Sequence, residues 1–94
     1  MARLASVEKA GFYPTPARVV DLIASMVKPG IGAVVLDPCC GEGDALAVLG
    51  KAWGATTVGN ELSKERAAEA AKKLDVVTHG PIEFLHVEGQ LSLP

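Results

Sequence analysis

Apolar residues recur along the chain at two spacings, one typical of helices and one typical of strands. A helical spacing follows Thr15-Pro16, where threonine is expected to cap the helix and proline to begin it. Its apolar positions are Val19, Val20, Leu22, Ile23, Met26 and Val27. A continuous apolar run at 33–36, bounded by glycine and proline, then predicts a strand buried on both faces of a parallel sheet.

The remaining pattern repeats this alternation. Helical spacing returns at 45–53, and a short strand is expected at 56–60. Ser63 is expected to cap a third helix, with an inner stripe of Ala67, Ala70, Ala71 and Leu74 and a solvent face of Lys64, Glu65, Arg66, Glu69, Lys72 and Lys73. Strands at 75–79 and 82–87 complete the pattern. The order predicts the βαβαβ half of a doubly wound, Rossmann-like α/β sheet, preceded by an N-terminal helix.

The chain has 94 residues, which is enough for a single core. We expect one partial domain, with an N-terminal segment at 1–15, the βαβαβ core at 16–80 and an irregular end at 81–94. Half of a doubly wound sheet leaves a strand edge and apolar surface uncovered, and this favours a homo-oligomer.

Composition and charge narrow the functional classes. Nine basic and eleven acidic residues give a net charge of −2. These residues therefore cannot bind nucleic acid through an overall positive charge. No apolar run approaches the roughly 18 residues of a membrane span, and the first residues lack the apolar stretch of a signal peptide. Cys39 and Cys40 are adjacent, which suits neither a structural disulfide nor a metal site, so a cytoplasmic protein is expected.

Candidate chemistry concentrates where the first two strands end. The first strand delivers Asp37, a turn with Gly41 and Gly43 follows, and a helix opens directly after it. Glycines allow a ligand close to the backbone, and a helix N-terminus offers N–H groups to a carboxylate or phosphate. Glu61 ends the second strand, where a carboxylate can accept hydrogen bonds from ribose hydroxyls.

Other nucleotide sites fit this pattern less well. The nicotinamide fingerprint requires a third glycine where Leu46 stands, and no Gly-Lys-Ser/Thr follows the turn as in a phosphate-binding loop of the Walker type. Two alternatives remain open: another nucleotide-binding module of Rossmann type, and a non-catalytic module that oligomerises.

The segment Leu36-Asp37-Pro38-Cys39-Cys40-Gly41-Glu42-Gly43 resembles motif I of class I methyltransferases that use S-adenosylmethionine (SAM). Its Asp-Pro-x-x-Gly-x-Gly form is similar to that of enzymes that methylate amino groups of nucleic acids. The stretch from Gly11 to Pro16 resembles the Phe-x-Thr-Pro segment of adenine-N6 methyltransferases, and the run from Gly11 to about Gly80 is similar to an uncharacterised bacterial family of such enzymes.

The resemblance implies a SAM site and an exocyclic amine of nucleic acid as the methyl acceptor of the complete enzyme. The implied cofactor-binding residues are Tyr13, Thr15, Asp37, Pro38, Cys39, Gly41, Gly43, Glu61 and Leu62. Tyr13 and Thr15 would flank the methionine, the motif I turn would hold it, and Glu61 would hold the ribose.

Two features of the family pattern are missing. Gly80-Pro81-Ile82 stands where the family usually carries an acidic residue against the adenine, and the sequence contains no Asn/Asp-Pro-Pro-aromatic motif. That motif positions the acceptor amine. We therefore expect a truncated methyltransferase with no catalytic residue of its own, which does not methylate without the missing half.

Overall fold

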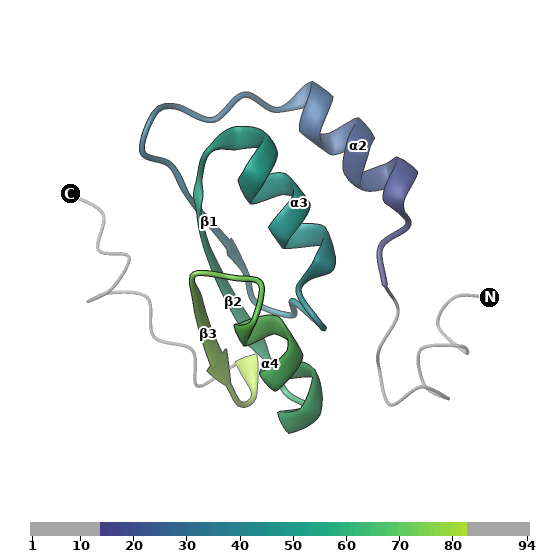
Figure 1. Ribbon diagram of the computed structural model, residues 1–94, viewed down its shortest axis with the longest axis vertical. Coiled ribbons are helices and arrows are strands. Elements are labelled where there is room, and N and C mark those ends of the chain that lie inside the picture. Colours follow the sequence, from purple (N-terminus) through teal and green to yellow (C-terminus); the bar gives the residue numbers. More distant parts are fainter. Residues whose placement is uncertain (1–13, 83–94) are drawn as a thin grey trace.

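Helices and strands alternate in the computed structural model, which describes residues 14–82 (Figure 1). The elements are α2 (Ala17–Met26), β1 (Val34–Asp37), α3 (Asp44–Trp53), β2 (Thr56–Glu61), α4 (Lys64–Ala71) and β3 (Val76–His79). The three strands pair in parallel in the order β1-β2-β3. The prediction of a Rossmann-like α/β half-sheet preceded by a helix is confirmed.

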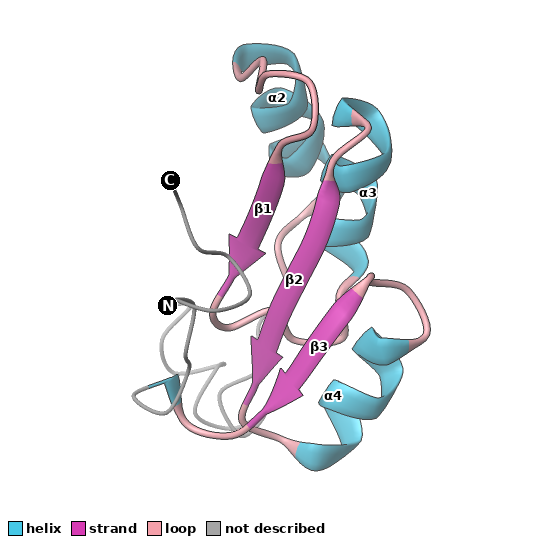
Figure 2. Cartoon of the chain, turned by 90° about the vertical axis from the view of Figure 1, so that its left-hand side faces the viewer, coloured by secondary structure: helices cyan, strands magenta, loops and turns pink. Residues whose placement is uncertain are grey.

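The described helices lie on one face of the sheet (Figure 2). Right-handed crossovers between parallel strands that are neighbours in sequence bring α3 and α4 to the same side. The core there consists of Cys40, Leu46, Ala70 and Leu74, with Val35, Ala47 and Val77 packed against it. This arrangement joins the β1–α3 turn, through Cys40, to the same core as both helices.

The opposite face of the sheet corrects one prediction. The first strand was expected to be buried on both sides, but Val34 is 49% exposed and Val76 on β3 is 44% exposed. The physical reason is that, within residues 14–82, the helices contact the sheet from one side, so alternate side chains of β1 and β3 face away from them.

Two details of the helices also differ from the sequence prediction. The N-cap of α2 is Pro16, in extended conformation and without a side-chain cap bond, so Thr15 does not cap this helix. The Pro16 carbonyl instead accepts from the backbone N–H groups of Val19 and Val20, at 3.0 and 3.1 Å. In the expected inner stripe of α4, Ala67, Ala70 and Leu74 are buried as predicted, whereas Ala71 is exposed.

Some expectations fall on parts of the chain that the structure does not describe. The further strand predicted at 82–87 lies outside the described residues except for Ile82, and Tyr13 lies outside them too. Between residues 14 and 82, no helix has the length and apolar character needed to cross a membrane.

Candidate functional site

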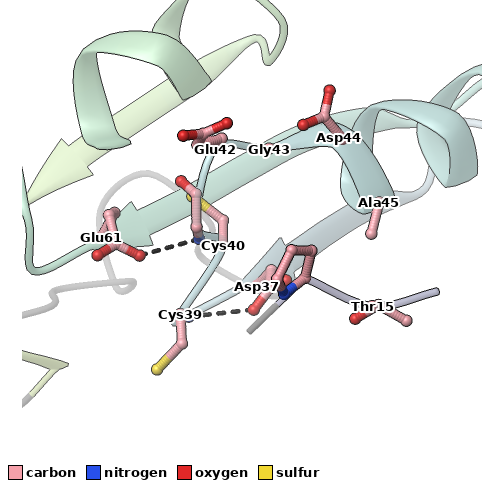
Figure 3. A pocket seen from close by; sticks show the side chains of 11 residues that line it. Thr15, Asp37, Cys39, Cys40, Glu42, Gly43, Asp44, Ala45 and Glu61 are labelled. Atoms are coloured by element: carbon pink, nitrogen blue, oxygen red, sulfur yellow. Dashed lines mark hydrogen bonds between the residues drawn. The ribbon is translucent and has the colours of Figure 1, made fainter. Parts of the chain in front are cut away.

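The carboxyl ends of β1 and β2 meet at one edge of the sheet, and a pocket lies there (Figure 3). Ligands of open α/β sheets bind in this crevice. The described residues that line it are Pro14, Thr15, Asp37, Cys39, Cys40, Gly41, Glu42, Gly43, Asp44, Ala45 and Glu61. The pocket encloses about 130 Å³, whereas typical small-molecule sites enclose roughly 300–1,000 Å³. It therefore has room for part of a nucleoside-sized ligand.

The turn from β1 to α3 forms one wall of the pocket. The Oδ1 atom of Asp37 accepts a hydrogen bond from the backbone N–H of Cys39 at 3.0 Å, which bends the chain directly after the strand. Gly41 and Gly43 then adopt left-handed conformations, with φ of 61° and 88°. Gly43 is the N-cap of α3 and supplies no side-chain cap, so the helix N-terminus opens toward the pocket with its backbone N–H groups.

Two glycines, Gly43 and Gly59, allow the β1–α3 turn to pack closely against the segment of α4 and against β2. A Cβ atom at Gly43 would lie 3.2 Å from Ala70 and from Leu74. A Cβ at Gly59 would lie 2.6 Å from the Sγ atom of Cys40, so this glycine makes room for the cysteine that anchors the turn. Packing against Cys40 thus explains why a glycine stands inside β2.

Glu61, at the end of β2, lies under the turn and is 6% exposed. Its Oε1 atom accepts from the backbone N–H of Gly41 at 2.9 Å, and its Oε2 atom accepts from the backbone N–H of Ser63, also at 2.9 Å. The carboxylate therefore joins the turn of β1 to the start of α4 while it lines the pocket.

Arg66 corrects the expected solvent face of α4. Its Nε and Nη2 atoms each lie 3.1 Å from Oε2 of Glu61, and its side chain is only 16% exposed. A guanidinium that pairs with a buried carboxylate is drawn away from water. The helical pattern alone placed this arginine with the exposed lysines, because its partner is on another element.

Asn60 is a residue that the sequence analysis missed. It is 3% exposed, and its Nδ2 atom donates to the carbonyls of Pro38 at 3.2 Å and Gly80 at 3.0 Å. Its Oδ1 atom accepts from the hydroxyl of Thr78 at 2.8 Å. One amide thus connects the ends of all three strands. The sequence offered one signal for this role. Asn60 directly precedes Glu61 in a predicted strand of a buried sheet, where a polar side chain needs hydrogen-bond partners.

The two cysteines occupy different environments. Cys40 is buried, and this burial, helped by the negative charges of Asp37 and Glu61, raises the pKa of its thiol to about 11. Cys39 is exposed and lines the pocket, whereas Cys40 fills the tight space beside Gly59. Among the described residues, no group of three or more His, Cys, Asp and Glu side chains is placed to hold a metal ion.

The charged side chains lining the described pocket are all carboxylates, namely Asp37, Glu42, Asp44 and Glu61. Arg66 compensates Glu61, and the ammonium of Lys73 lies 3.0 Å from Asp44. That hydrogen bond raises the pKa of Lys73. The remaining negative charge favours a ligand with a cationic centre.

The predicted site residues divide into two groups. Thr15, Asp37, Cys39, Gly41, Gly43 and Glu61 come together around the pocket. Pro38 and Leu62 are not among its described lining: Pro38 gives its carbonyl to Asn60, and Leu62 is 66% exposed, with its carbonyl 3.0 Å from Nε2 of His79. Tyr13 lies outside the described residues.

Comparison with known proteins places the chain among methyltransferases. The model of an uncharacterised methyltransferase family (DUF6094) matches residues 1–91. No curated protein matches the sequence.

Several solved structures share the fold. An RNA methyltransferase from Salinibacter ruber in complex with S-adenosyl-L-homocysteine has a TM-score of 0.67 at 21% identity, over 81% of this chain and 55% of that one. YjhP from E. coli has a TM-score of 0.60 at 20% identity, over 72% of this chain and 31% of that one. A SAM-dependent methyltransferase from Geobacter sulfurreducens, also in complex with S-adenosyl-L-homocysteine, has a TM-score of 0.54 at 23% identity, over 86% of this chain and 36% of that one. The chain spans between 31% and 55% of the length of these proteins.

Proposed function

Because the chain belongs to this uncharacterised methyltransferase family, we propose that its pocket binds SAM as the cofactor portion of a methyltransferase. The observation that carries the proposal is one hydrogen bond: the backbone N–H of Gly41 donates to Glu61 at 2.9 Å. It brings the glycine turn that suits an amino-acid end and the carboxylate that suits a ribose into the same pocket.

The residues present fit the two polar ends of SAM. The N-terminus of α3 and the turn before it can receive the carboxylate of the methionine part. Asp37 can accept a hydrogen bond from its ammonium, and Glu61 can accept one from a ribose hydroxyl. When bound, SAM supplies a methyl group on a positively charged sulfur, and its transfer to a nucleophile leaves a neutral thioether.

The charge of the pocket favours SAM over phosphate-bearing nucleotides. The described lining carries carboxylates, and SAM carries a sulfonium and an ammonium against one carboxylate. NAD and ATP would bring additional negative charge beside Asp37 and Glu42. The two neighbours crystallised with S-adenosyl-L-homocysteine support the proposal, since they share the fold that builds this edge of the sheet.

For the acceptor, we propose an exocyclic amine of nucleic acid. The support is the Asp-Pro-Cys-Cys-Gly-Glu-Gly sequence of the turn, together with the fold shared with an RNA methyltransferase. The sequence has no Asn/Asp-Pro-Pro-aromatic segment to hold such an amine in line with the methyl group. We therefore propose that these 94 residues bind the cofactor and do not catalyse transfer alone. Methyl transfer from radiolabelled SAM to mixed DNA and RNA at an ordinary enzymatic rate would contradict this.

Calorimetric titration of the chain with SAM, S-adenosylhomocysteine, NAD and ATP tests the cofactor. We expect the two sulfur nucleosides to bind and NAD and ATP to bind more weakly or not at all. Asp37→Asn removes a charge-assisted contact and should weaken SAM binding roughly tenfold. Asp21→Asn, on the exposed face of α2, is the matched control. Tighter binding of NAD than of SAM would favour the nucleotide-binding alternative.

We also propose that the chain self-associates, because Val34 and Val76 leave apolar surface on the sheet face opposite the helices. Light scattering over micromolar concentrations tests this. A mass above that of one chain supports association, and a monomer at all concentrations rejects it.

A further inference from the structure

The carboxylate of Glu61 receives its hydrogen bonds unevenly. Two hydrogen bonds converge on Oε2, from the backbone N–H of Ser63 at 2.9 Å and from Nε of Arg66 at 3.1 Å. The Nη2 atom of Arg66 completes an ion pair with the same oxygen at 3.1 Å. Among the described residues, Oε1 has one donor, the backbone N–H of Gly41 at 2.9 Å. Before any ligand binds, Oε2 therefore accepts more hydrogen bonds than Oε1 does.

This difference limits how a ribose can bind. An ionised carboxylate offers about four lone-pair sites, roughly two on each oxygen. Oε2 has no capacity left for a hydroxyl while the backbone N–H of Ser63 and Nε of Arg66 both donate to it, whereas Oε1 can accept one more hydrogen bond. The usual two-oxygen contact with both hydroxyls of a ribose would require the guanidinium of Arg66 to leave.

Resting on the proposed function, we propose that Arg66 is a positioning residue that makes Glu61 recognise a ribose through the single oxygen Oε1. Arg66 lies in the first turn of α4, whose start is fixed by the cap of Ser63. The guanidinium holds Oε2 through two nitrogens, so the plane of the carboxylate cannot rotate freely. The oxygen that stays available is the one bonded to the Gly41 turn that lines the pocket.

Arginine suits this role better than lysine would. Its planar fork presents two N–H groups from fixed directions, whereas an ammonium is a compact charge that can leave without breaking a second bond. The side chains of Glu61 and Arg66 are 8% and 16% exposed, so water competes little for either partner. The same pair on the surface would exchange freely with solvent.

The first test compares ligands on the unaltered 94-residue chain. S-adenosylhomocysteine and its 2′-deoxy and 3′-deoxy analogues are titrated by calorimetry or by amide chemical shifts. We expect one deoxy analogue to bind about tenfold more weakly than the parent and the other to lose less than about threefold. Losses of tenfold or more for both analogues would show a two-oxygen contact and overturn the proposal. If both analogues bind as tightly as the parent, Glu61 does not contact the ribose, and the proposal is overturned as well.

The second test changes the arginine. Arg66→Met keeps an unbranched side chain without its donors. The matched control is Lys72→Met, which removes the cation of an exposed ion pair at the C-cap of α4. We expect Arg66→Met to weaken the binding of S-adenosylhomocysteine about tenfold and to bring the affinities of the two deoxy analogues within about twofold of each other. Arg66→Lys should restore part of the preference, and Lys72→Met should leave it intact. Arg66→Met with the full preference would reject the role.

The outcomes separate the two proposals. If the unaltered chain binds S-adenosylhomocysteine without preferring one hydroxyl, the role of Arg66 is rejected and the proposed function stands. If neither SAM nor S-adenosylhomocysteine binds, the proposed function is rejected and the role of Arg66 with it. If Arg66→Met does not fold, the ligand comparison on the unaltered chain still decides.

Discussion

The turn from β1 to α3 and the turn from β2 to α4 leave the same edge of the sheet and satisfy their backbone groups differently. The first turn uses two left-handed glycines and starts α3 without a side-chain cap. The second starts α4 with the hydroxyl of Ser63, which accepts from the backbone N–H of Arg66 at 3.3 Å. One helix start is open toward the pocket, and the other is closed by its own chain.

The carboxylates of the two turns also differ, because Asp37 makes a local contact whereas Glu61 joins separate elements. Asp37 bonds to the backbone two residues further on, in a contact that stays partly exposed. Glu61 is buried and holds groups from the other turn and from α4. The comparison indicates that the first turn is shaped to receive a ligand, while the second mainly supports it. Substitutions at the two turns should therefore affect stability unequally.

The largest effect is expected from Glu61→Ala. It removes the buried carboxylate that pairs with Arg66 and that accepts hydrogen bonds from two backbone N–H groups. Loss of one partner of a buried ion pair costs about 3–5 kcal/mol of unfolding free energy, measured by urea denaturation. Glu69→Ala removes an exposed ion pair on the same helix and should cost less than about 1 kcal/mol. Equal losses would show that Glu61 does not support the site.

Gly43→Ala comes next and tests the first turn. The residue has φ of 88°, and the added Cβ would lie 3.2 Å from Ala70 and Leu74. Left-handed strain in a non-glycine residue costs roughly 1–3 kcal/mol, and the crowding adds to it. Gly54→Ala isolates the strain, because Gly54 has φ of 62° and no described heavy atom within 4 Å of its added Cβ. Thermal unfolding of both variants should show Gly43→Ala as the less stable.

Ser63→Ala should produce a smaller loss, because it removes a single cap bond at the second turn. Replacing an N-cap serine with alanine costs about 1 kcal/mol. The amide of Arg66 should then exchange its hydrogen faster, and this can be followed by NMR. A loss as large as that of Glu61→Ala would contradict this order, because it would mean that the hydroxyl supports the second turn as much as the carboxylate does.

The mildest effect concerns pH and the thiol that joins the first turn to β2. Burial raises the pKa of Cys40 from about 9 to about 11, so the folded chain holds this proton more tightly than the unfolded chain does. The contribution to stability is complete below about pH 9 and is lost as the pH rises toward 11. We expect the urea midpoint to fall over this range, and to fall less in Cys40→Ala. If the urea midpoint falls equally in the parent chain and in Cys40→Ala, the thiol is not the cause of the pH dependence.

Prediction from sequence succeeded where the signal is local in the chain. The alternation of spacings gave the three strands, and the positions of Asp37, Gly41 and Gly43 after an apolar run gave the turn. Ser63 acts as the cap that its position indicated, because capping depends on residues within one turn. These features require no knowledge of what lies across the sheet.

Prediction failed where a side chain finds its partner on another element. Arg66 has the helical position of a solvent-facing residue, and only the end of β2 turns it inward. Asn60 was not singled out because its three partners lie on other segments, one in β3 and two directly after β1 and β3. The exposure of Val34 depends on which side the helices cover, and the pattern of a single strand does not contain that information.

The amide of Asn60 also has a kinetic consequence. It fixes the carbonyls of Pro38 and Gly80 and the hydroxyl of Thr78, so the segments that follow β1 and β3 are tied together before any ligand arrives. Ordering a loop on binding costs free energy, and here the hydrogen bonds of Asn60 have already ordered these segments on folding. Arrival of a ligand then requires diffusion and orientation but no rearrangement of these segments. Ligands of similar charge should therefore enter at similar rates and differ mainly in how long they stay.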